Sequence, residues 1–450
     1  LISAVFLLAI IDGEQNKFEA NAAIHVVNGS YIGIGFYFFL MKNYPESFSD
    51  LWQSILPSAP QAFDMLLLCF FFQNVGSYIL WAWITPLSQA VSKWSTLPNN
   101  AVNLTFIKTP QHQVILFIIL SSFGLISRLW NLSLGNIYYT QGSGVPFFIS
   151  SFLFQFDRLY VIGWLYGYSL WLKPYFRRNT VVRLTWLLIF VEFIYQLFSG
   201  SKGRFFNFVI LPMASVFILT KQKVGWRAIG LIGGGGLLSW LLVYPILVIY
   251  RHLLVTTALG GNINPIDTLN LAFETLSTYS LDTYIETILR PLNDSGIAEQ
   301  VTAMTSIIHY QVSQEGSLLW QRLFLFWVPR FLWSDKPIAL SGNLIGRLSN
   351  RLNDHDFMTS VLITGVGELY LYYGLLGSTL MALVGLLFRW MNESISPFRY
   401  PTPFRVAVFV AFLPLMQGIL SGTFESGLTG IILQLGVLYF VLNFVKMVIL

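Results

Sequence analysis

Several short clusters of charged and aromatic residues in this sequence could carry chemistry. The first is the turn at residues 199–204, in which Lys202 and Arg204 stand among glycine and serine residues. Small residues let a backbone approach a ligand closely, and two neighbouring cations suit a phosphate group. Cations that contact lipid headgroups would also explain this turn, so both interpretations stay open.

The second cluster is the densest one, at residues 327–337. Its sequence is Trp-Val-Pro-Arg-Phe-Leu-Trp-Ser-Asp-Lys-Pro, in which two prolines bracket Arg330, Trp333, Asp335 and Lys336. Tryptophan suits a membrane interface and also packs on the apolar face of a sugar. The pattern therefore favours a ligand site, and an interfacial anchor with a local Asp–Lys pair is the alternative.

Two further charged positions lie in or beside apolar sequence. Arg251 ends an apolar run, where it could extend to lipid headgroups or face a polar cavity. Glu368 lies within an apolar block, with Tyr370 two residues later. An acid inside a membrane segment indicates function by default, although pairing with a basic residue for structure is equally open.

Asp157 and Arg158 are adjacent in the middle of another apolar run. Neighbouring residues of a helix point about 100° apart. We therefore expect each side chain to pair with a different helix, in a structural role.

Composition decides the class of protein that must position these residues. The chain has 450 residues, of which 55% are hydrophobic and 10% are charged, whereas a soluble domain carries about 25% charged residues. The sequence therefore predicts an all-α polytopic membrane protein. The net charge of +5 is typical of cytoplasmic loops and does not indicate nucleic acid as a partner.

The sequence also argues against several kinds of metal and disulfide site. Its only cysteine is Cys69, which excludes an intrachain disulfide and a multi-cysteine metal site. Histidine and glutamate residues with metal-ligand spacing are also missing. We expect neither a metal nor a cofactor.

Apolar runs of the length needed to cross a membrane, about 20 residues, predict about eleven transmembrane helices. Because the sequence opens inside the first run, we expect further residues before Leu1. The predicted spans are 1–11, 22–41, 62–90, 113–127, 145–172, 184–200, 205–220, 228–250, 358–388, 403–420 and 427–447.

Lysine and arginine in the loops predict the orientation. Basic clusters at 173–183, 221–227 and 389–405 indicate cytoplasmic loops. The alternation then puts residues 199–204, 251–357 and 421–426 on the outer side. We divide the chain into an N-terminal bundle (1–250), an extracytoplasmic loop (251–357) and C-terminal helices (358–450).

The extracytoplasmic loop is too long to lack structure. Residues 268–290 and 297–325 have helical spacing, which predicts two or three external or re-entrant helices. Cations could converge on the outer side and bind an anionic ligand from the outer leaflet, such as a polyprenyl pyrophosphate. These cations are Lys202, Arg204, Arg251, Arg290, Arg330 and Lys336.

Three of these motifs resemble one family in order and spacing, over about residues 180–450. They are Ser-Lys-Gly-Arg at 201–204, Val-Pro-Arg-Phe-Leu-Trp-Ser-Asp-Lys-Pro at 328–337, and Gly-Glu-Leu-Tyr-Leu-Tyr-Tyr-Gly-Leu-Leu-Gly at 367–377. The chain is similar here to the Wzy-like bacterial oligosaccharide repeat-unit polymerases.

The resemblance implies a metal-independent glycosyltransferase with a GT-C-like fold in the bacterial inner (plasma) membrane, with its active site on the periplasmic side. Such an enzyme moves a growing glycan from undecaprenyl pyrophosphate onto a lipid-linked repeat unit. Donor and acceptor would both be undecaprenyl-pyrophosphate-linked oligosaccharides. The family also implies a co-polymerase that determines chain length.

Residue roles follow from this chemistry as hypotheses. The cations would neutralise the leaving pyrophosphate, and Trp333 and Tyr370 would contact sugars. The acceptor hydroxyl needs a base, for which His309 is our first choice because its ordinary pKa suits the task. Glu368 and Asp335 are the alternatives.

Two rival functions stay open. An O-antigen ligase-type glycosyltransferase would use the same donor with a different acceptor. A transporter or flippase of lipid-linked sugars would place charge within its spans, whereas the ionisable residues of this chain gather in the outer segment.

Overall fold

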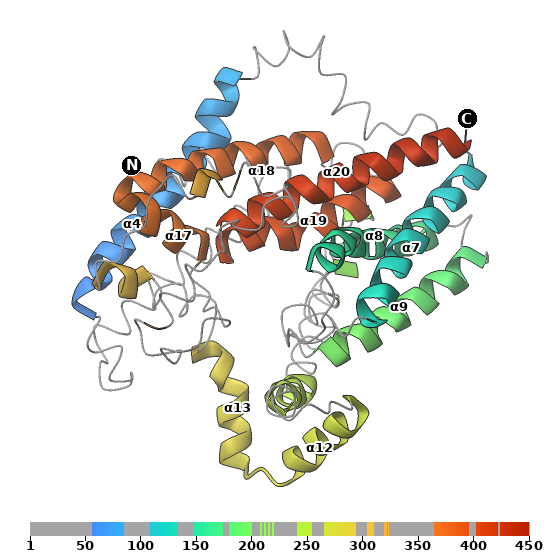
Figure 1. Ribbon diagram of the computed structural model, residues 1–450, viewed down its shortest axis with the longest axis horizontal. Coiled ribbons are helices and arrows are strands. Elements are labelled where there is room, and N and C mark those ends of the chain that lie inside the picture. The colour runs from blue at the N-terminus through green and yellow to red at the C-terminus, as the bar shows by residue number, and fades with distance from the viewer. Residues whose placement is uncertain are drawn as a thin grey trace. The chain divides into compact units, whose positions relative to one another are not determined.

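The computed structural model describes about half of the chain, and every helix named below lies in that part (Figure 1). The described segments are all-helical apart from short turns, and they contain no strand. The described residues are 56–84, 109–133, 147–173, 180–199, 208, 211–212, 215–216, 218–219, 241–253, 265–293, 304–309, 319–321, 323, 347, 364–395, 402–421 and 424–449.

The chain forms two compact units, and each is built from separate stretches of sequence. Unit 1 comprises Leu1–Asn103, Asp294–Arg399 and Phe412–Leu433. Unit 2 comprises Leu104–Asn293, Tyr400–Ala411 and Gln434–Leu450. The predicted division into 1–250, 251–357 and 358–450 describes on which side of the membrane each segment lies. The two units do not test it, and it stays a prediction.

Unit 1 is formed by helices from both ends of the sequence. Its described elements are η2 (Leu56–Ser58), α4 (Ala59–Asn74), the π-helix η3 (Val75–Leu80), α17 (Thr364–Tyr373), η5 (Gly374–Leu380), α18 (Met381–Ile395), the end of α19 (Pro403–Ser421) and the start of α20 (Phe424–Ile449).

The contact between α4, η3 and α18 depends on two glycines. A Cβ atom on Gly76 would overlap the backbone carbonyl of Ala382, and one on Gly385 would overlap that of Gln73. Ser77 Oγ donates to the Gly385 carbonyl oxygen at 3.0 Å. Small residues of this kind let helix backbones approach closely inside a membrane.

Unit 2 contains three long helices, α7 (Pro110–Ser133), α8 (Phe147–Trp171) and α9 (Thr180–Ser199). Gly124 and Gly163 let α7 and α8 approach closely, since a Cβ atom on Gly124 would overlap the backbone of Tyr160 and one on Gly163 would overlap Ser121 Oγ. The ring of Phe123 on α7 stacks on Phe156 of α8, with centroids 6.3 Å apart.

Unit 2 also holds a smaller group of helices, in which α12 (Pro265–Ser277) and α13 (Leu281–Asn293) flank the Leu241–Leu253 helix. The sequence predicted one helical segment over 268–290, and the structure breaks it at residues 278–280. Ser280 begins α13, because its Oγ accepts the Thr283 N–H at 3.2 Å and its carbonyl accepts the Tyr284 N–H at 2.9 Å.

Four of the described helices are long and apolar enough to cross a membrane: Pro60–Ile84, Pro110–Trp130, Gly365–Met391 and Gly427–Ile449. They agree with four predicted spans. Two shorter apolar helices overlap two more predicted spans: Leu241–Leu253 overlaps 228–250, and Pro403–Met416 lies within 403–420. The predicted spans at 1–11 and 22–41 lie outside the described residues, and the count of eleven stays a prediction.

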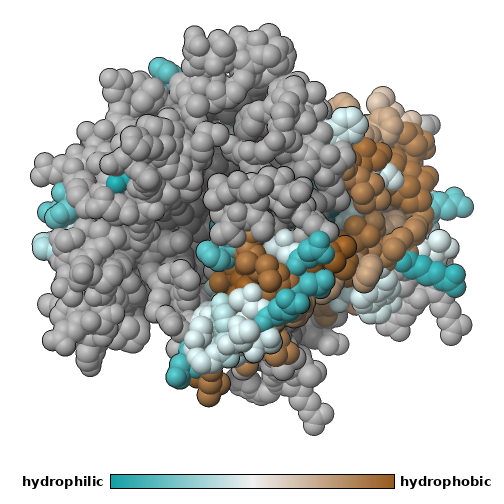
Figure 2. All heavy atoms as spheres, turned by 60° about the horizontal axis from the view of Figure 1, so that its bottom comes forward, coloured by the Kyte–Doolittle hydropathy of each residue, from teal (hydrophilic) through white to brown (hydrophobic). Residues whose placement is uncertain are grey.

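Large apolar side chains cover the outside of unit 2. Trp130 on α7 and Trp186, Leu187 and Phe190 on α9 are exposed, and Figure 2 shows the broad hydrophobic surface at the right over these helices. A surface of this kind is typical of helices that face lipid.

Replacing Gly385 by leucine is expected to separate α18 from α4, because the side chain has no room beside the Gln73 carbonyl. Overpacking of this kind costs about 1–3 kcal/mol or more. The check is thermal stability in detergent, read by size-exclusion chromatography. Gly436→Leu is the matched control, because a Cβ there meets nothing within 4 Å; equal stability of the two variants would contradict the packing described.

Candidate functional site

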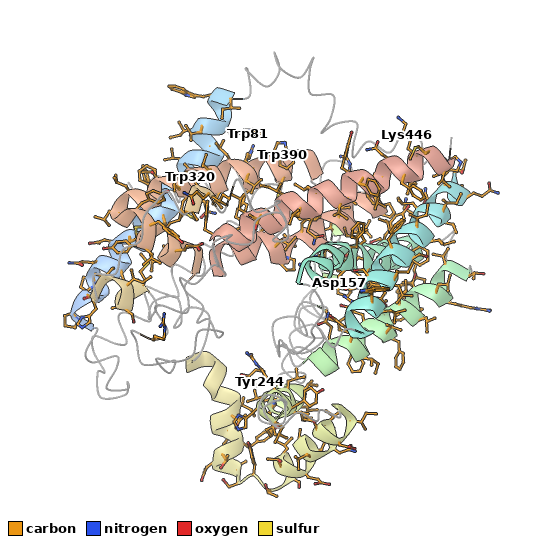
Figure 3. All side chains as sticks on the ribbon, viewed as in Figure 1. Trp81, Asp157, Tyr244, Trp320, Trp390 and Lys446 are labelled. Carbon is orange, nitrogen blue, oxygen red and sulfur yellow. The ribbon has the colours of Figure 1, made fainter. Side chains whose placement is uncertain are left out.

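A buried arginine joins the three long helices of unit 2. Arg128 on α7 is 1% exposed. Its Nε donates to Asp157 Oδ1 of α8 at 2.7 Å, and its Nη2 donates to Asp157 Oδ2 at 3.1 Å. Its Nη1 pairs with Glu192 Oε2 of α9. One guanidinium therefore binds a carboxylate on each of two other helices (Asp157 is labelled in Figure 3).

Aromatic and amide side chains complete this ion cluster. The Arg128 guanidinium carbon lies 4.3 Å from the ring centroid of Tyr160 and 4.2 Å from that of Tyr195. Tyr160 donates to the Leu188 carbonyl oxygen at 2.7 Å. Gln196 Nε2 donates to Glu192 Oε1 at 2.5 Å. Ring faces attract a cation most strongly where water is excluded.

Helical periodicity explains how these groups come together. Asp157 and Tyr160 are three residues apart on α8. Glu192, Tyr195 and Gln196 have the spacing of one face of α9. Gly124 lets α7 approach the backbone of Tyr160 on α8. Arg128 lies one turn further along α7, where it contacts the face of α8 that carries Asp157 and the face of α9 that carries Glu192.

The charge balance of the cluster limits what it can do. Its one cation faces two carboxylates, Asp157 and Glu192. A buried ion pair contributes little net stability, but removing one partner leaves an uncompensated charge. The cluster is therefore suited to fixing the register of the three helices.

The sequence predicted part of this arrangement. We expected Asp157 to pair with another helix, and its bond to Arg128 confirms this. Arg128 was missed because the predicted span 113–127 ends one residue before it, and Glu192 was missed although it lies within the predicted span 184–200. The available signal was a basic and an acidic residue within apolar helices. Asp157, Arg128 and Glu192 are exceptions to the expectation that ionisable residues gather in the predicted outer segment.

The candidate catalytic residues that the structure describes have different environments. Glu368 on α17 in unit 1 is 0% exposed, and Tyr370 beside it is half-buried. His309, also in unit 1, is exposed. In unit 2, Arg251 is exposed on the Leu241–Leu253 helix, and the backbone of Arg290 lies in α13.

The other candidate residues lie outside the described part of the chain, so their convergence on one ligand stays a prediction. They are Lys202, Arg204, Arg330, Trp333, Asp335 and Lys336. Among the described residues, no group of three or more histidine, cysteine, aspartate or glutamate side chains is arranged to hold a metal ion.

One contact links the predicted outer segment to the third sequence motif. The Trp320 indole N–H donates to the hydroxyl of Tyr373, the last residue of α17. Both residues belong to unit 1 (Trp320 is labelled in Figure 3). Trp320 therefore lies beside the end of α17, the helix that carries Glu368.

Comparison with known proteins assigns the chain to no family, so its structural class comes from the structure alone. No family model matches the chain, and neither a curated protein nor a solved structure shows significant similarity to it. The fold is that of an all-α protein with helices long and apolar enough to cross a membrane.

Substituting Arg128 by methionine should destabilise unit 2, because Asp157 and Glu192 would then face each other without their cation. The expected loss is about 3–5 kcal/mol, read as a lower thermal midpoint in detergent. Arg183→Met changes an exposed arginine of α9 and serves as the control. Equal midpoints would show that the cluster does not hold the helices.

Proposed function

We propose that this chain is a polysaccharide polymerase of the Wzy type, a glycosyltransferase with about eleven membrane helices and a GT-C-like fold. It would act at the outer face of the bacterial inner membrane. The observation that carries the proposal is the resemblance of the motifs at 201–204, 328–337 and 367–377, in this order.

The third of these motifs forms most of α17 and the start of η5. Gly374 has φ +59°, a conformation that other residues rarely adopt, and ends α17. A Cβ on Gly377 would overlap the Leu369 carbonyl. The glycines of the motif therefore bend the chain back beside Glu368, which is buried there.

The proposed reaction transfers a glycan between two carrier lipids. An acceptor hydroxyl of the new repeat unit attacks the anomeric carbon of the donor glycan as the bond to the pyrophosphate oxygen breaks. The pyrophosphate leaves on its carrier, and the hydroxyl proton passes to a base. Attack in line with the leaving group inverts the anomeric configuration.

The cations and the base have separate roles in this reaction. Lys202, Arg204, Arg251, Arg290, Arg330 and Lys336 would bind the pyrophosphates and stabilise the charge that develops on the leaving group, in place of a divalent metal. His309 is the preferred base because its exposed side chain can return the proton to water. Asp335 and the buried Glu368 remain the alternatives.

The sugars and the partners complete the proposal. Trp333 and Tyr370 would contact sugar rings. The bilayer would hold both undecaprenyl tails, and a chain-length co-polymerase would be the protein partner.

The buried Arg128–Asp157–Glu192 cluster favours a second candidate, a transporter or flippase of lipid-linked sugars. Ionisable groups inside membrane helices often mark a proton or substrate path. An O-antigen ligase is the third alternative, because it would use the same donor.

Deletion of the gene separates the three functions. Loss of polymer with accumulation of single lipid-linked repeat units, sized by mass spectrometry after extraction, is the result expected for a polymerase. Long lipid-linked chains would instead indicate a ligase. Repeat units confined to the inner leaflet, or unchanged glycans, would contradict a glycosyltransferase.

Arg330→Ala should abolish long chains while protein levels and single capped repeat units remain. Removal of one preorganised group lowers the rate about 10²–10³-fold. Polymer length on gels is the readout. Lys446→Ala, at the exposed end of α20, is the matched charge control and should keep wild-type chains. Long chains from the Arg330 variant would remove this residue from the mechanism.

His309→Ala should lower transfer by about 10²–10⁴-fold if His309 is the base. The activity is measured with purified enzyme and lipid-linked repeat units. Glu368→Gln is compared in parallel, since it keeps the size of the buried side chain and removes its ability to take a proton. Near-normal activity of the histidine variant together with an inactive glutamine variant would transfer the role to Glu368.

A further inference from the structure

The hairpin formed by α12 and α13 packs on the Leu241–Leu253 helix with one side and exposes large apolar side chains on the other. Its inner side packs on the Leu241–Leu253 helix, around a core of Ile249, Tyr250 and Ala272. In Figure 1 that helix is seen end-on between α12 and α13, and Tyr244 marks it in Figure 3. The hairpin therefore runs across the helix. The residues packed against the core are Leu253, Leu269, Leu276 and Tyr279.

A tyrosine hydrogen bond joins α13 to the apolar part of that helix. Residue 245 is a proline, which has no N–H to donate to the Leu241 carbonyl four residues earlier. Tyr284 of α13 donates its hydroxyl to this carbonyl oxygen, at 2.5 Å. The hairpin thus satisfies a backbone acceptor that the helix cannot satisfy itself.

The outer side of the hairpin exposes large apolar side chains. On α13, Leu281 is 74% exposed and Ile285 is 45% exposed. Four-residue spacing puts them on one face, whereas Thr283 points about 160° away from Leu281. On α12, Ile266 and Phe273 are exposed seven residues apart. Brown patches bordered by teal over these helices in Figure 2 show the two kinds of surface.

The hydroxyl groups near the tip of the hairpin are satisfied by its own backbone. Thr275 donates to the Leu271 carbonyl, Ser277 to that of Glu274 and Thr278 to that of Thr275, each at 2.7 Å. Together with the Ser280 cap, these bonds reduce the need for water at the end of α12 and the start of α13.

The position of the hairpin along the Leu241–Leu253 helix indicates which environment surrounds the apolar side of the hairpin. The helix is apolar from residue 241 to residue 250 and becomes polar at Arg251 and His252, both exposed. The core at Ile249 and Tyr250 lies at this boundary, and Tyr284 reaches back to Leu241 on the apolar side. Apolar area left in water at that level would cost about 25 cal/mol per Å².

We propose that α12 and α13 lie in the outer membrane–water interface, with Leu281, Ile285, Ile266 and Phe273 inserted among lipid acyl chains. The acidic Asp267 and Glu274 stand about 100° around α12 from Ile266 and Phe273 and stay toward water. The inference goes beyond the proposed glycosyl transfer and does not depend on it.

Fluorescent labels on single cysteines can test this placement. The chain has one cysteine, Cys69, which is buried, so a Cys69→Ala background leaves only introduced thiols. The full chain carrying Leu281→Cys, Ile285→Cys or Phe273→Cys is labelled with bimane in phosphatidylethanolamine–phosphatidylglycerol vesicles. Thr283→Cys is the control on the polar face of the same turn of α13.

We expect labels at the three apolar positions to lose fluorescence to doxyl-labelled lipids and to resist iodide, with the opposite result at position 283. Iodide quenching at all positions would put the hairpin in water and overturn the proposal. Protection from both quenchers would mean that protein covers the face, for example a second copy of this chain, and would also overturn it.

A second measurement tests the attachment of the hairpin without changing the apolar face. Tyr284→Phe keeps the ring and removes the hydroxyl that binds Leu241. The label at position 285 should then lose part of its quenching by doxyl lipid, because α13 is no longer held at that depth. Unchanged quenching would show that the tyrosine does not set the position of the hairpin.

Discussion

Charge burial among apolar helices is the constraint on which unit 2 depends. Arg128 is surrounded by α7, α8 and α9, and a guanidinium in such a place must be paired. Asp157 and Glu192 supply the charge, and Tyr160 and Tyr195 supply ring faces. Each of the three helices contributes at least one group, so a shift of any helix along its axis would break a contact with the arginine.

Close approach of backbones is the complementary constraint. Lipid surrounds membrane helices with an environment as apolar as their own side chains, so association rests on tight packing and on bonds between polar groups. Gly76 and Gly385 in unit 1 and Gly124 and Gly163 in unit 2 provide the packing. Ser77 and Tyr160 provide bonds to carbonyls of neighbouring helices.

The need to pair buried polar groups also applies in the regions proposed to be functional. In unit 1, Glu368 is fully buried and His309 is exposed, and in unit 2 Arg251 is exposed. Pro245 frees a carbonyl in the Leu241–Leu253 helix, and Tyr284 binds it. A missing backbone donor in one helix thereby provides an attachment point for α13.

The amino-acid sequence by itself determined the class of the protein. In lipid a backbone must satisfy its own hydrogen bonds, so long apolar runs with few charges predict helices, and the described helices follow those runs closely. Periodicity also showed that Asp157 must find its partner on another helix. Only the tertiary structure decided that the partner is Arg128, that Glu192 shares it, and that Tyr284 binds Leu241. Arg128 and Asp157 are 29 residues apart in the sequence, and Tyr284 and Leu241 are 43 residues apart. Which residues pair depends on how the helices pack, and local spacing in the sequence does not encode that packing.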